Sequence, residues 1–261
     1  MRQLPLISLR ATGLPFGKPA TVVNTADCAI ENGMAAALPP GQRARDDFPR
    51  FGVPAYASRL LRTPASFELR VEREDGSACA PVRMDDFNEL QRRELVADFH
   101  CVATWTRRGL CWSGYEFRDF YRRLFSPRAR PSASCPYLEF KALDGYTACI
   151  LLEDLLQGDV LLVDRLQGEP LPLEHGGPIR LIVPQLYGFK SVKHVCAIRP
   201  RADYRRSFAE RRTLAHPRGR VALEERGRGL PGPIYRFIYR AILPPTLWYY
   251  RRKEKQGKSL R

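Results

Sequence analysis

LQGEPLPLEHGGPIRLIVPQLYGFKSVKHV, residues 166–195, is the stretch that says most about the fold of this protein. Within it, the basic residues His175, Arg180 and Lys193 stand among glycines and prolines. Glycine lets a backbone approach a bound molecule closely, arginine offers a forked donor to phosphate, and lysine offers a point charge. The backbone N–H groups of residues 188–192 are candidates for an anion-binding nest. These residue types suit a phosphorylated cofactor, and by themselves they fit a glycine-rich turn bearing surface charges equally well.

A second candidate site lies upstream, where the apolar stretch DFHCVATW (98–105) carries Cys101. A cysteine thiolate is a nucleophile or a ligand for a soft metal, and a buried structural thiol is the alternative interpretation. Although His100 precedes it, successive side chains of a strand point to opposite faces, so the pattern argues against a local Cys–His pair. The seven cysteines of the chain include no CxxC pair, which excludes zinc-finger spacing.

Four segments of the chain, in one order, resemble those of the sulfite-oxidase-like molybdopterin enzymes. They are FPRFGVP (48–54), FHCVATW followed by CWSGYEF (99–117), LDGYTACILLEDLL (143–156) and the stretch 166–195. The resemblance covers about residues 48–200. It implies an α+β fold, namely a single mixed sulfite-oxidase-type molybdopterin-binding domain with a basic C-terminal extension.

The resemblance also implies a cofactor and the residues that hold it. It implies one mononuclear molybdenum centre on molybdopterin, with Cys101 as the protein ligand of the metal. Cys101 and Arg50 are the implied catalytic residues, since Arg50 matches an arginine that faces the oxyanion substrate in sulfite oxidases. The implied cofactor contacts are Phe48, Pro49, Arg50, Phe51, Gly52, Asp144, His175, Arg180, Ser191, Val192 and Lys193.

Two departures from the family pattern weaken the match to sulfite as the substrate. A tyrosine near the metal of sulfite oxidases follows an Arg-Arg pair, and Leu214 takes its place here. Phe51-Gly52 replaces an Asn-His pair in the N-terminal cofactor segment. Tyr115 and Tyr146 are candidate donors near the site, with a place in the core as the alternative for both.

The function implied is an oxidoreductase that transfers an oxygen atom to or from a small oxyanion or sulfoxide-type substrate. We expect an external electron-transfer partner, because the sequence shows no motif for haem, flavin or an iron–sulfur cluster. The alternative function is a non-catalytic binding protein that uses a basic, aromatic tail on a membrane surface or nucleic acid. Of these two partners we expect the membrane contact and no nucleic acid.

The charge distribution sets the tail apart from the rest of the chain. The 261 residues are 44% hydrophobic and carry a net charge of +15. Residues 201–261 hold 17 basic and 5 acidic residues, whereas residues 1–200 hold 26 and 23.

No run approaches the ~18–20 apolar residues of a membrane-spanning helix. The first 20 residues contain prolines and glycines in place of the apolar core of an export signal, which predicts a cytoplasmic protein, with membrane association as a variant.

We divide the chain into a loose lead-in (1–45), a molybdopterin-binding catalytic domain (46–200) and a basic, aromatic extension (201–261). Polar–apolar alternation and strand-like composition predict strands at 66–73, 96–105 and 137–143. Helical spacing predicts a helix at 84–95, a turn that leads into a helix at 111–125, and a short helix at 152–156.

The tail sequence IYRFIYRAILPPTLWYY (234–250) combines aromatic, aliphatic and basic residues. Pro244-Pro245 predicts a helix break, because proline lacks the N–H of a helical hydrogen bond. We therefore expect a short helix of about 10 residues and then an extended aromatic strip. Packing of the strip on the core, with the last ~10 residues free, is the favoured arrangement, and attachment to an anionic membrane is the alternative.

Overall fold

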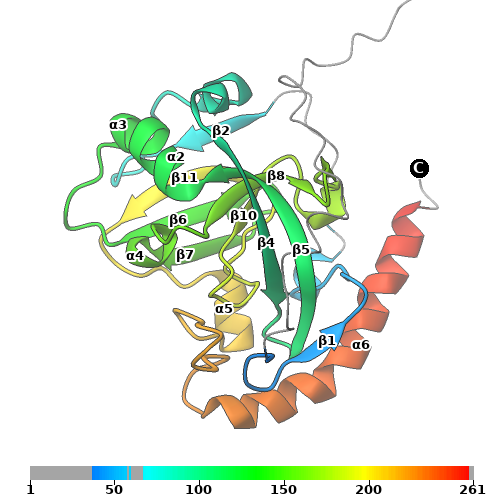
Figure 1. Cartoon of the computed structure of the whole chain (residues 1–261). Helices are drawn as coiled ribbons and strands as arrows, with labels where there is room; N and C mark the ends of the chain where they lie inside the picture. The colour runs from blue at the N-terminus through cyan, green and yellow to red at the C-terminus, as the bar shows by residue number, and fades with distance from the viewer. Residues whose placement is uncertain (1–36, 58, 60–66, 259–261) are drawn as a thin grey trace, which may run out of the picture.

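The computed structural model describes residues 37–57, 59 and 67–258, with side chains described as far as Lys253. Most of the expected lead-in, residues 1–36, lies outside the described residues. Two β-sheets and a small number of helices make up the fold (Figure 1). The expected mixed α+β class is confirmed.

The larger sheet has six strands and follows the path β1-β5-β8-β10, while β4 pairs with β5 and β9 pairs with β8. Its strands are β1 (Arg43–Arg45), β4 (Arg92–His100), β5 (Trp105–Glu116), β8 (Leu161–Leu166), β9 (Glu169–Pro170) and β10 (Arg180–Ile182). Strands β4 and β5 form a long antiparallel hairpin whose turn falls at residues 101–104. This hairpin places Cys101 at one end of the sheet.

The smaller sheet has five strands in the order β3-β2-β11-β6-β7. Its strands are β2 (Glu68–Val71), β3 (Val82–Arg83), β6 (Tyr137–Ala142), β7 (Thr147–Leu151) and β11 (Val195–Arg201). Strand β11 joins its two halves, since it pairs parallel with β2 and antiparallel with β6. Strands β2 and β6 confirm, in shorter form, the strands expected at 66–73 and 137–143.

Most helical segments are short, and only α6 (Gly232–Lys258) is long among the described residues. The short segments are η1 (Pro54–Tyr56), η2 (Met84–Glu89), α2 (Phe117–Phe120), η3 (Tyr121–Phe125), α3 (Ser126–Ala129), α4 (Leu152–Leu155), η4 (Leu173–His175) and α5 (Phe208–Thr213). Segment α4 confirms the short helix expected at 152–156. The segments α2, η3 and α3 follow one another directly, so the chain is helical from residue 117 to residue 129.

Three hydrophobic clusters hold these elements together. The largest draws buried side chains from both sheets and from the helical stretch 117–129, so the two sheets share one core. A second cluster lies on the larger sheet around Trp112. The third joins Cys101, Ala103 and Trp105 of the β4–β5 hairpin to tyrosines of α6.

Two predicted elements differ from the structure. The helix expected at 84–95 is a six-residue 3-10 segment, η2, and residues 92–95 already belong to β4, because pairing with β5 outweighs their helical spacing. The turn expected at residue 111 lies inside β5, whose strand includes Gly114. A Cβ at Gly114 would come within 2.1 Å of the Leu162 carbonyl oxygen of β8. This glycine therefore permits close strand packing instead of forming a turn.

The described end of the lead-in is also more ordered than we expected. Residues 43–45 form β1, which pairs parallel with the start of β5 at Trp105. The side-chain amide of Gln42 donates a hydrogen bond of 3.1 Å to the Cys101 carbonyl oxygen. This short stretch consequently supports the β4–β5 turn.

Helix α6 contradicts the expected break at Pro244-Pro245, because it continues through both prolines. Buried side chains at a spacing of about four residues lie on both sides of the pair: Tyr235, Tyr239, Leu247 and Tyr250. A proline inside a helix costs about 3 kcal/mol, and each fully buried large apolar side chain contributes about 1.5–3 kcal/mol. Packing on both sides thus outweighs the missing hydrogen bonds.

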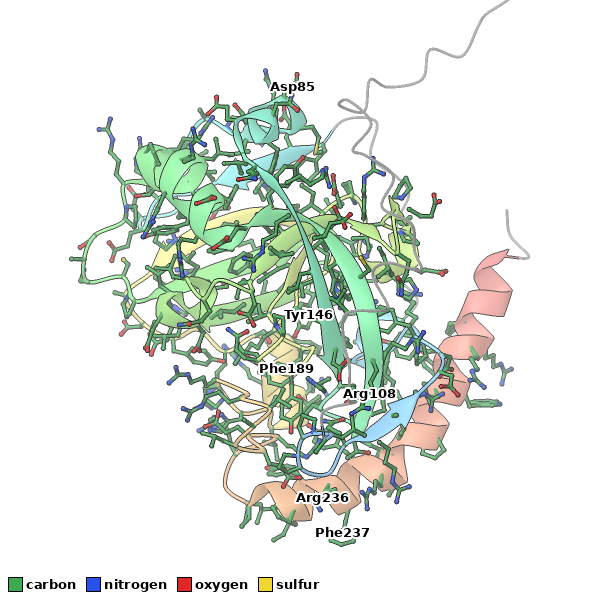
Figure 2. All side chains as sticks on the ribbon, in the orientation of Figure 1. Asp85, Arg108, Tyr146, Phe189, Arg236 and Phe237 are labelled. Carbon is green, nitrogen blue, oxygen red and sulfur yellow. The ribbon has the colours of Figure 1, made fainter. Side chains whose placement is uncertain are left out.

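The aromatic part of α6 packs on the body, as we expected for the tail, although as a helix and not as an extended strip. Figure 1 shows the helix passing the side of the molecule where β1 and the turn of the β4–β5 hairpin lie. The opposite face of the helix is open, and Phe237 points away from the body (Figure 2). No helix in the described part of the chain combines the length and apolar character that a membrane crossing requires.

Candidate active site

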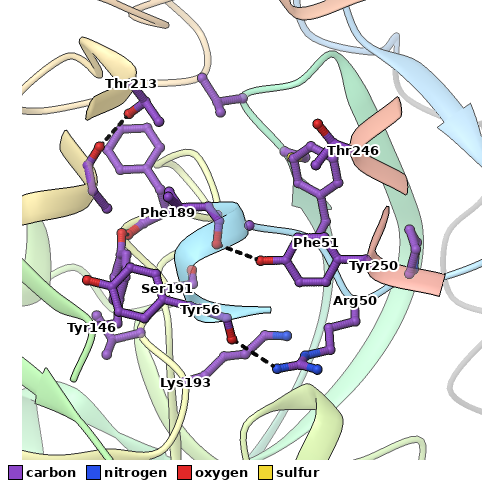
Figure 3. A pocket seen from close by; sticks show the side chains of 18 of the residues that line it. Arg50, Phe51, Tyr56, Tyr146, Phe189, Ser191, Lys193, Thr213, Thr246 and Tyr250 are labelled. Atoms are coloured by element: carbon purple, nitrogen blue, oxygen red, sulfur yellow. Dashed lines mark hydrogen bonds between the residues drawn. The ribbon is translucent and has the colours of Figure 1, made fainter. Parts of the chain in front are cut away.

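A cavity of about 230 Å³ lies where the two sheets, the segment after β1, α5 and α6 meet. Eleven of the twelve residues implied by the resemblance line it: Phe48, Pro49, Arg50, Phe51, Gly52, Cys101, Asp144, Arg180, Ser191, Val192 and Lys193. Figure 3 shows Arg50 and Lys193 close together on one side of this cavity. Segments far apart in the sequence thus meet at one concave site.

Cys101 follows the last residue of β4, and hydrogen bonds of the tight turn fix its position. Its N–H donates to the Trp105 carbonyl oxygen at 2.8 Å, and the N–H of Thr104 donates to the Cys101 carbonyl oxygen at 3.2 Å. The N–H of Ala103 donates to Sγ at 3.5 Å. With the residue only 7% exposed, burial raises the pKa of the thiol to about 12. The free protein therefore holds a protonated thiol, and a metal must displace that proton to bind.

His100 turns away from Cys101, as strand alternation predicted. Its Nδ1 lies 2.8 Å from the hydroxyl oxygen of Thr106 in β5. Burial lowers the pKa of this histidine, so its ring is neutral at neutral pH. The geometry provides no Cys–His pair.

The buried guanidinium of Arg180 is the strongest electrostatic feature of the site. The residue is 1% exposed, and its Nη1 donates to the His175 carbonyl oxygen at 2.8 Å. Its Nε has no partner among the described residues. The rings of Phe48, Phe99 and Trp112 surround the group at 4.8–5.8 Å. Desolvation lowers its pKa to about 9.

Two further cations line the same cavity. The Nζ of Lys193 donates to the Glu174 carbonyl oxygen at 2.8 Å, and Arg50 donates to the carbonyl oxygen of Ala57 at 3.0 Å. Burial, with smaller contributions from Arg180 and Arg50, lowers the pKa of Lys193 to about 7. In the described part of the chain none of these three cations forms an ion pair with a carboxylate, although Asp144 also lines the cavity.

The loop at 188–192 does not form the complete nest of N–H groups that we expected. The N–H groups of Gly188, Lys190 and Ser191 donate to backbone carbonyl oxygens within the fold. The hydroxyl oxygen of Ser191 accepts a hydrogen bond of 3.1 Å from the N–H of Val183. A Cβ at Gly188 would come within 2.1 Å of the ring of Phe99, so this glycine permits the loop to lie against β4. Side chains more than backbone donors therefore define this wall.

Asp144 and Tyr146 close the side of the cavity next to β6 and β7. The carboxylate of Asp144 accepts a hydrogen bond of 2.9 Å from the N–H of Tyr146, within the expected Asp-Gly turn. The hydroxyl of Tyr146 donates to the Phe189 carbonyl oxygen at 2.6 Å. Tyr146 lines the cavity, whereas Tyr115 lies in the main core, where its hydroxyl accepts a hydrogen bond from Arg92.

Residues of α6 form a wall of the cavity that sequence reasoning missed. They are Tyr239, Ile242, Thr246 and Tyr250. The hydroxyl of Tyr250 donates to the Val53 carbonyl oxygen at 2.9 Å, which ties the helix to the N-terminal cofactor segment. Tyr239 is buried, and its hydroxyl has no hydrogen-bond partner among the described residues. The short helix expected before Pro244 already includes Tyr239, four residues after Tyr235, but the expected break placed Thr246 and Tyr250 in an extended strip.

Arg226 was also missed, because it stands in a basic segment that resembles a solvated tail. Its side chain is fully buried. It donates to the carbonyl oxygens of Val102 at 2.6 Å and Pro40 at 2.9 Å, and it pairs with Glu224 at 3.0 Å. Arg226 therefore braces the turn that holds Cys101.

A model of the family described as oxidoreductase molybdopterin binding domain matches residues 55–209. The protein belongs to this family. Membership supports an enzyme and disfavours the alternative of a non-catalytic binding protein.

Three relatives illustrate the breadth of the family. The uncharacterized oxidoreductase YuiH of Bacillus subtilis is 29% identical over 194 residues, which cover 72% of this chain and 91% of YuiH. The catalytic subunit MsrP of the protein-methionine-sulfoxide reductase of Ralstonia nicotianae is 29% identical over 176 residues, which cover 59% and 50%. The MsrP of Xanthomonas campestris is 26% identical over 171 residues, which cover 59% and 52%. The chain thus spans about half the length of the MsrP proteins.

Among solved structures, the sulfane dehydrogenase SoxCD of Paracoccus pantotrophus is similar with a TM-score of 0.48 and 18% identity. The similarity covers 62% of this chain and 45% of the SoxCD chain.

The donor set of the cavity fits a molybdopterin. The buried Nε of Arg180 lacks a partner in the described residues and suits an anionic phosphate, as does the ammonium group of Lys193. The thiol of Cys101 suits a soft metal. No group of three His, Cys, Asp or Glu side chains suitable for a metal occurs in the described residues. A metal held here by Cys101 would accordingly take its further ligands from the cofactor.

His175 is the one implied residue that does not line the cavity. Its ring stacks on Phe48, with centroids 4.6 Å apart and planes 10° apart. Burial, reinforced by Lys193 and Arg180, lowers its pKa to about 3, so the ring is neutral. Nδ1 is buried without a partner in the described residues. A direct cofactor contact from His175 stays a prediction. The observed stacking holds the ring of Phe48, which does line the cavity, in place.

Proposed function

We propose that this protein uses a molybdopterin cofactor to reduce a small sulfoxide-type substrate with electrons from a separate carrier. The observation that carries the proposal is the meeting of a buried thiol, Cys101, with three cations that form no ion pair among the described residues, all in one cavity. A bound cofactor of this type supplies two-electron chemistry and an oxygen-accepting metal position.

In this proposal Cys101 is the metal ligand, and Arg180 and Lys193 hold the cofactor phosphate. Arg180 is already fixed by its hydrogen bond to His175 and by the rings around it, so binding orders it little further. Pairing with a phosphate restores the cationic state that burial disfavours at Lys193. Asp144 and Ser191 then provide polar contacts to the pterin.

The substrate side of the cavity favours a molecule with one polar oxygen and apolar substituents. Arg50 provides a cation, its guanidinium lies 5.7 Å from the centre of the Tyr250 ring, and Tyr250 and Ile242 of α6 make the wall beside it largely apolar. A sulfoxide combines these two characters. An oxyanion such as sulfite is polar on all sides and would leave the apolar wall without a partner.

The proposed reaction converts a sulfoxide to a sulfide and water with two electrons and two protons. We assign Arg50 and the hydroxyl of Tyr239, which has no partner within the described segments, to hydrogen bonds with the substrate oxygen. The MsrP relatives are named protein-methionine-sulfoxide reductases, which supports this class of substrate.

The test combines metal and pterin analysis with a substrate panel. Protein from a host that makes the cofactor should contain about one molybdenum and one molybdopterin per chain. With reduced viologen as electron donor it should consume dimethyl sulfoxide and methionine sulfoxide, each in proportion to donor oxidised. Rapid sulfite oxidation with ferricyanide, without sulfoxide reduction, would replace the substrate assignment by an oxyanion. Absence of molybdenum from such protein would overturn the proposal.

A further inference from the structure

Helix α6 carries a second apolar stripe on the face opposite to its buried tyrosines. The stripe consists of Ile234, Phe237, Ile238 and Trp248, with Ile242 at its edge toward the cavity. Its members recur at spacings of three and four residues with one longer gap, so they lie along one side of the helix. Phe237 is 70% exposed and Trp248 is 60% exposed. In Figure 2, Phe237 points away from the body.

This stripe concentrates much of the exposed apolar surface of the protein. Five of the ten large hydrophobic residues that are exposed in the described part of the chain lie on α6. Single exposed apolar residues are ordinary on protein surfaces, but a continuous row marks an interaction surface. The inner face of the helix already packs on the core, so core packing does not account for the outer row.

The charges of α6 identify the chemistry of the surface that it meets. The helix sequence holds seven basic residues and one acidic residue. Three consecutive basic residues, Arg251, Arg252 and Lys253, follow Trp248 by one turn, and the guanidinium of Arg252 lies 5.3 Å from the centre of the Trp248 ring. The required partner is therefore negatively charged at its surface and apolar just beneath it.

We propose that the outer face of α6 binds an anionic lipid bilayer and lies in the plane of its surface. A 27-residue helix is about 40 Å long, which gives a long line of contact. Apolar and aromatic residues then enter the boundary between headgroups and acyl chains, while the basic residues contact anionic headgroups. A bilayer provides both properties along the whole length of the helix, whereas a protein partner would need a matching groove.

Docking by α6 also has a geometric consequence for the active site. Ile242 belongs to the outer stripe and lines the cavity at the same time. The same helix thus connects the cavity wall to the membrane-facing surface. Membrane docking does not depend on the cofactor or on the substrate, so it holds whether or not the proposed function is correct.

The test measures binding of the full chain to lipid vesicles. We expect co-sedimentation with vesicles of phosphatidylcholine and phosphatidylglycerol (7:3), weak binding to pure phosphatidylcholine, and release at high salt. Trp248 is the exposed member of the three tryptophans, since Trp105 and Trp112 are buried. Binding should therefore shift its fluorescence to the blue, and Trp248→Phe should remove most of this shift.

Matched variants separate a specific face from general stickiness. Phe237→Ser combined with Trp248→Ser should weaken the vesicle partition constant about 10-fold or more. Leu223→Ser removes an apolar side chain that is also 60% exposed but lies outside α6, and it should bind like the parent protein. Because each basic residue near an anionic membrane contributes about 1 kcal/mol, Arg252→Gln with Lys253→Gln should weaken binding about 25-fold at low salt.

Three results would overturn the inference. They are the absence of vesicle binding, equal binding to neutral and anionic vesicles, and binding that both pairs of α6 substitutions leave unchanged. Self-association through the α6 face in light scattering, without vesicle binding, would assign the stripe to a second copy of the chain and so also reject the bilayer.

Discussion

The two walls of the cavity differ in origin. One wall comes from the β4–β5 turn, the start of β10 and the loop before β11, and it supplies Cys101, Arg180 and Lys193. The other comes from α6, and it supplies Tyr239 and Ile242. The first wall consists of residues that local sequence motifs single out, whereas the second depends on a helix that local rules predict to break. The family resemblance therefore indicated residues of the first wall, whereas only the folded structure showed the second.

The largest effect that we expect is at Cys101. Replacement by serine keeps nearly the same volume, so the fold and its melting temperature should change little, while a soft metal loses its thiolate ligand. Turnover should fall below detection, and the spectrum of the metal should change. Cys111→Ser and Cys135→Ser are matched controls, because both thiols are also buried but do not line the cavity. Normal turnover of Cys101→Ser would show that Cys101 is not the metal ligand and that the first wall does not hold the reacting metal.

Arg180→Ala should weaken binding of the cofactor, and any loss of activity should follow from that. Loss of one charge-assisted contact costs roughly 1.5–3 kcal/mol, which corresponds to about a 10- to 150-fold loss of affinity. Purified Arg180→Ala protein should therefore be depleted in molybdenum and pterin when measured by elemental and fluorescence analysis. The exposed Arg83, replaced by alanine, provides a control that should retain full occupancy. Full occupancy in both variants would contradict the assignment.

Tyr239→Phe tests whether the α6 wall contributes to the reaction. The hydroxyl has no partner in the described residues, so its removal should leave unfolding unchanged. Loss of a donor to the substrate oxygen should lower kcat/KM about 10-fold or more. Tyr235→Phe is the matched control: its hydroxyl donates to the Arg228 carbonyl oxygen, so it should cost about 1 kcal/mol of stability and leave kcat/KM unchanged. Equal kinetics for the two variants would show that the wall is purely structural.

Pro244→Ala with Pro245→Ala probes the continuity of α6. Alanine restores the two missing N–H donors in a segment that is already helical. Because alanine is more favourable than proline inside a helix by up to about 3 kcal/mol per residue, we expect a higher midpoint in urea unfolding. A lower midpoint would mean that the prolines give α6 a shape that its buried tyrosines require.

The smallest effect concerns the pH dependence of the cofactor-free protein. The pKa of Lys193 is about 7 in the folded chain and 10.5 ordinarily, so between these values the unfolded chain binds more protons. Stability of the cofactor-free protein should therefore rise as the pH rises from about 7 to 10. Lys193→Met should reduce this rise in melting temperature. Cofactor phosphate should also reduce it, because the anion restores the charged form of the lysine.

Local sequence patterns predicted much of the fold. Alternation located β2 and β6, and a short apolar segment located α4. The patterns failed where contacts between distant segments decide. Gly114 reads as a turn but lies within β5, because β8 passes too close for a side chain. Residues 92–95 read as helix but form strand, because β5 pairs with them.

For the site, the sequence by itself determined which side chains suit a soft metal and a phosphate, since thiol and cation chemistry do not depend on the fold. It did not determine that Arg180 would be buried, that Arg226 would brace the turn at Cys101, or that Tyr239 would reach the same cavity. Those facts arise from the tertiary structure. The free-energy cost of Pro244-Pro245 within α6 arises from hydrogen bonds lost nearby in the helix. The burial that outweighs this cost involves residues far along the chain, so only the folded protein shows that the helix continues.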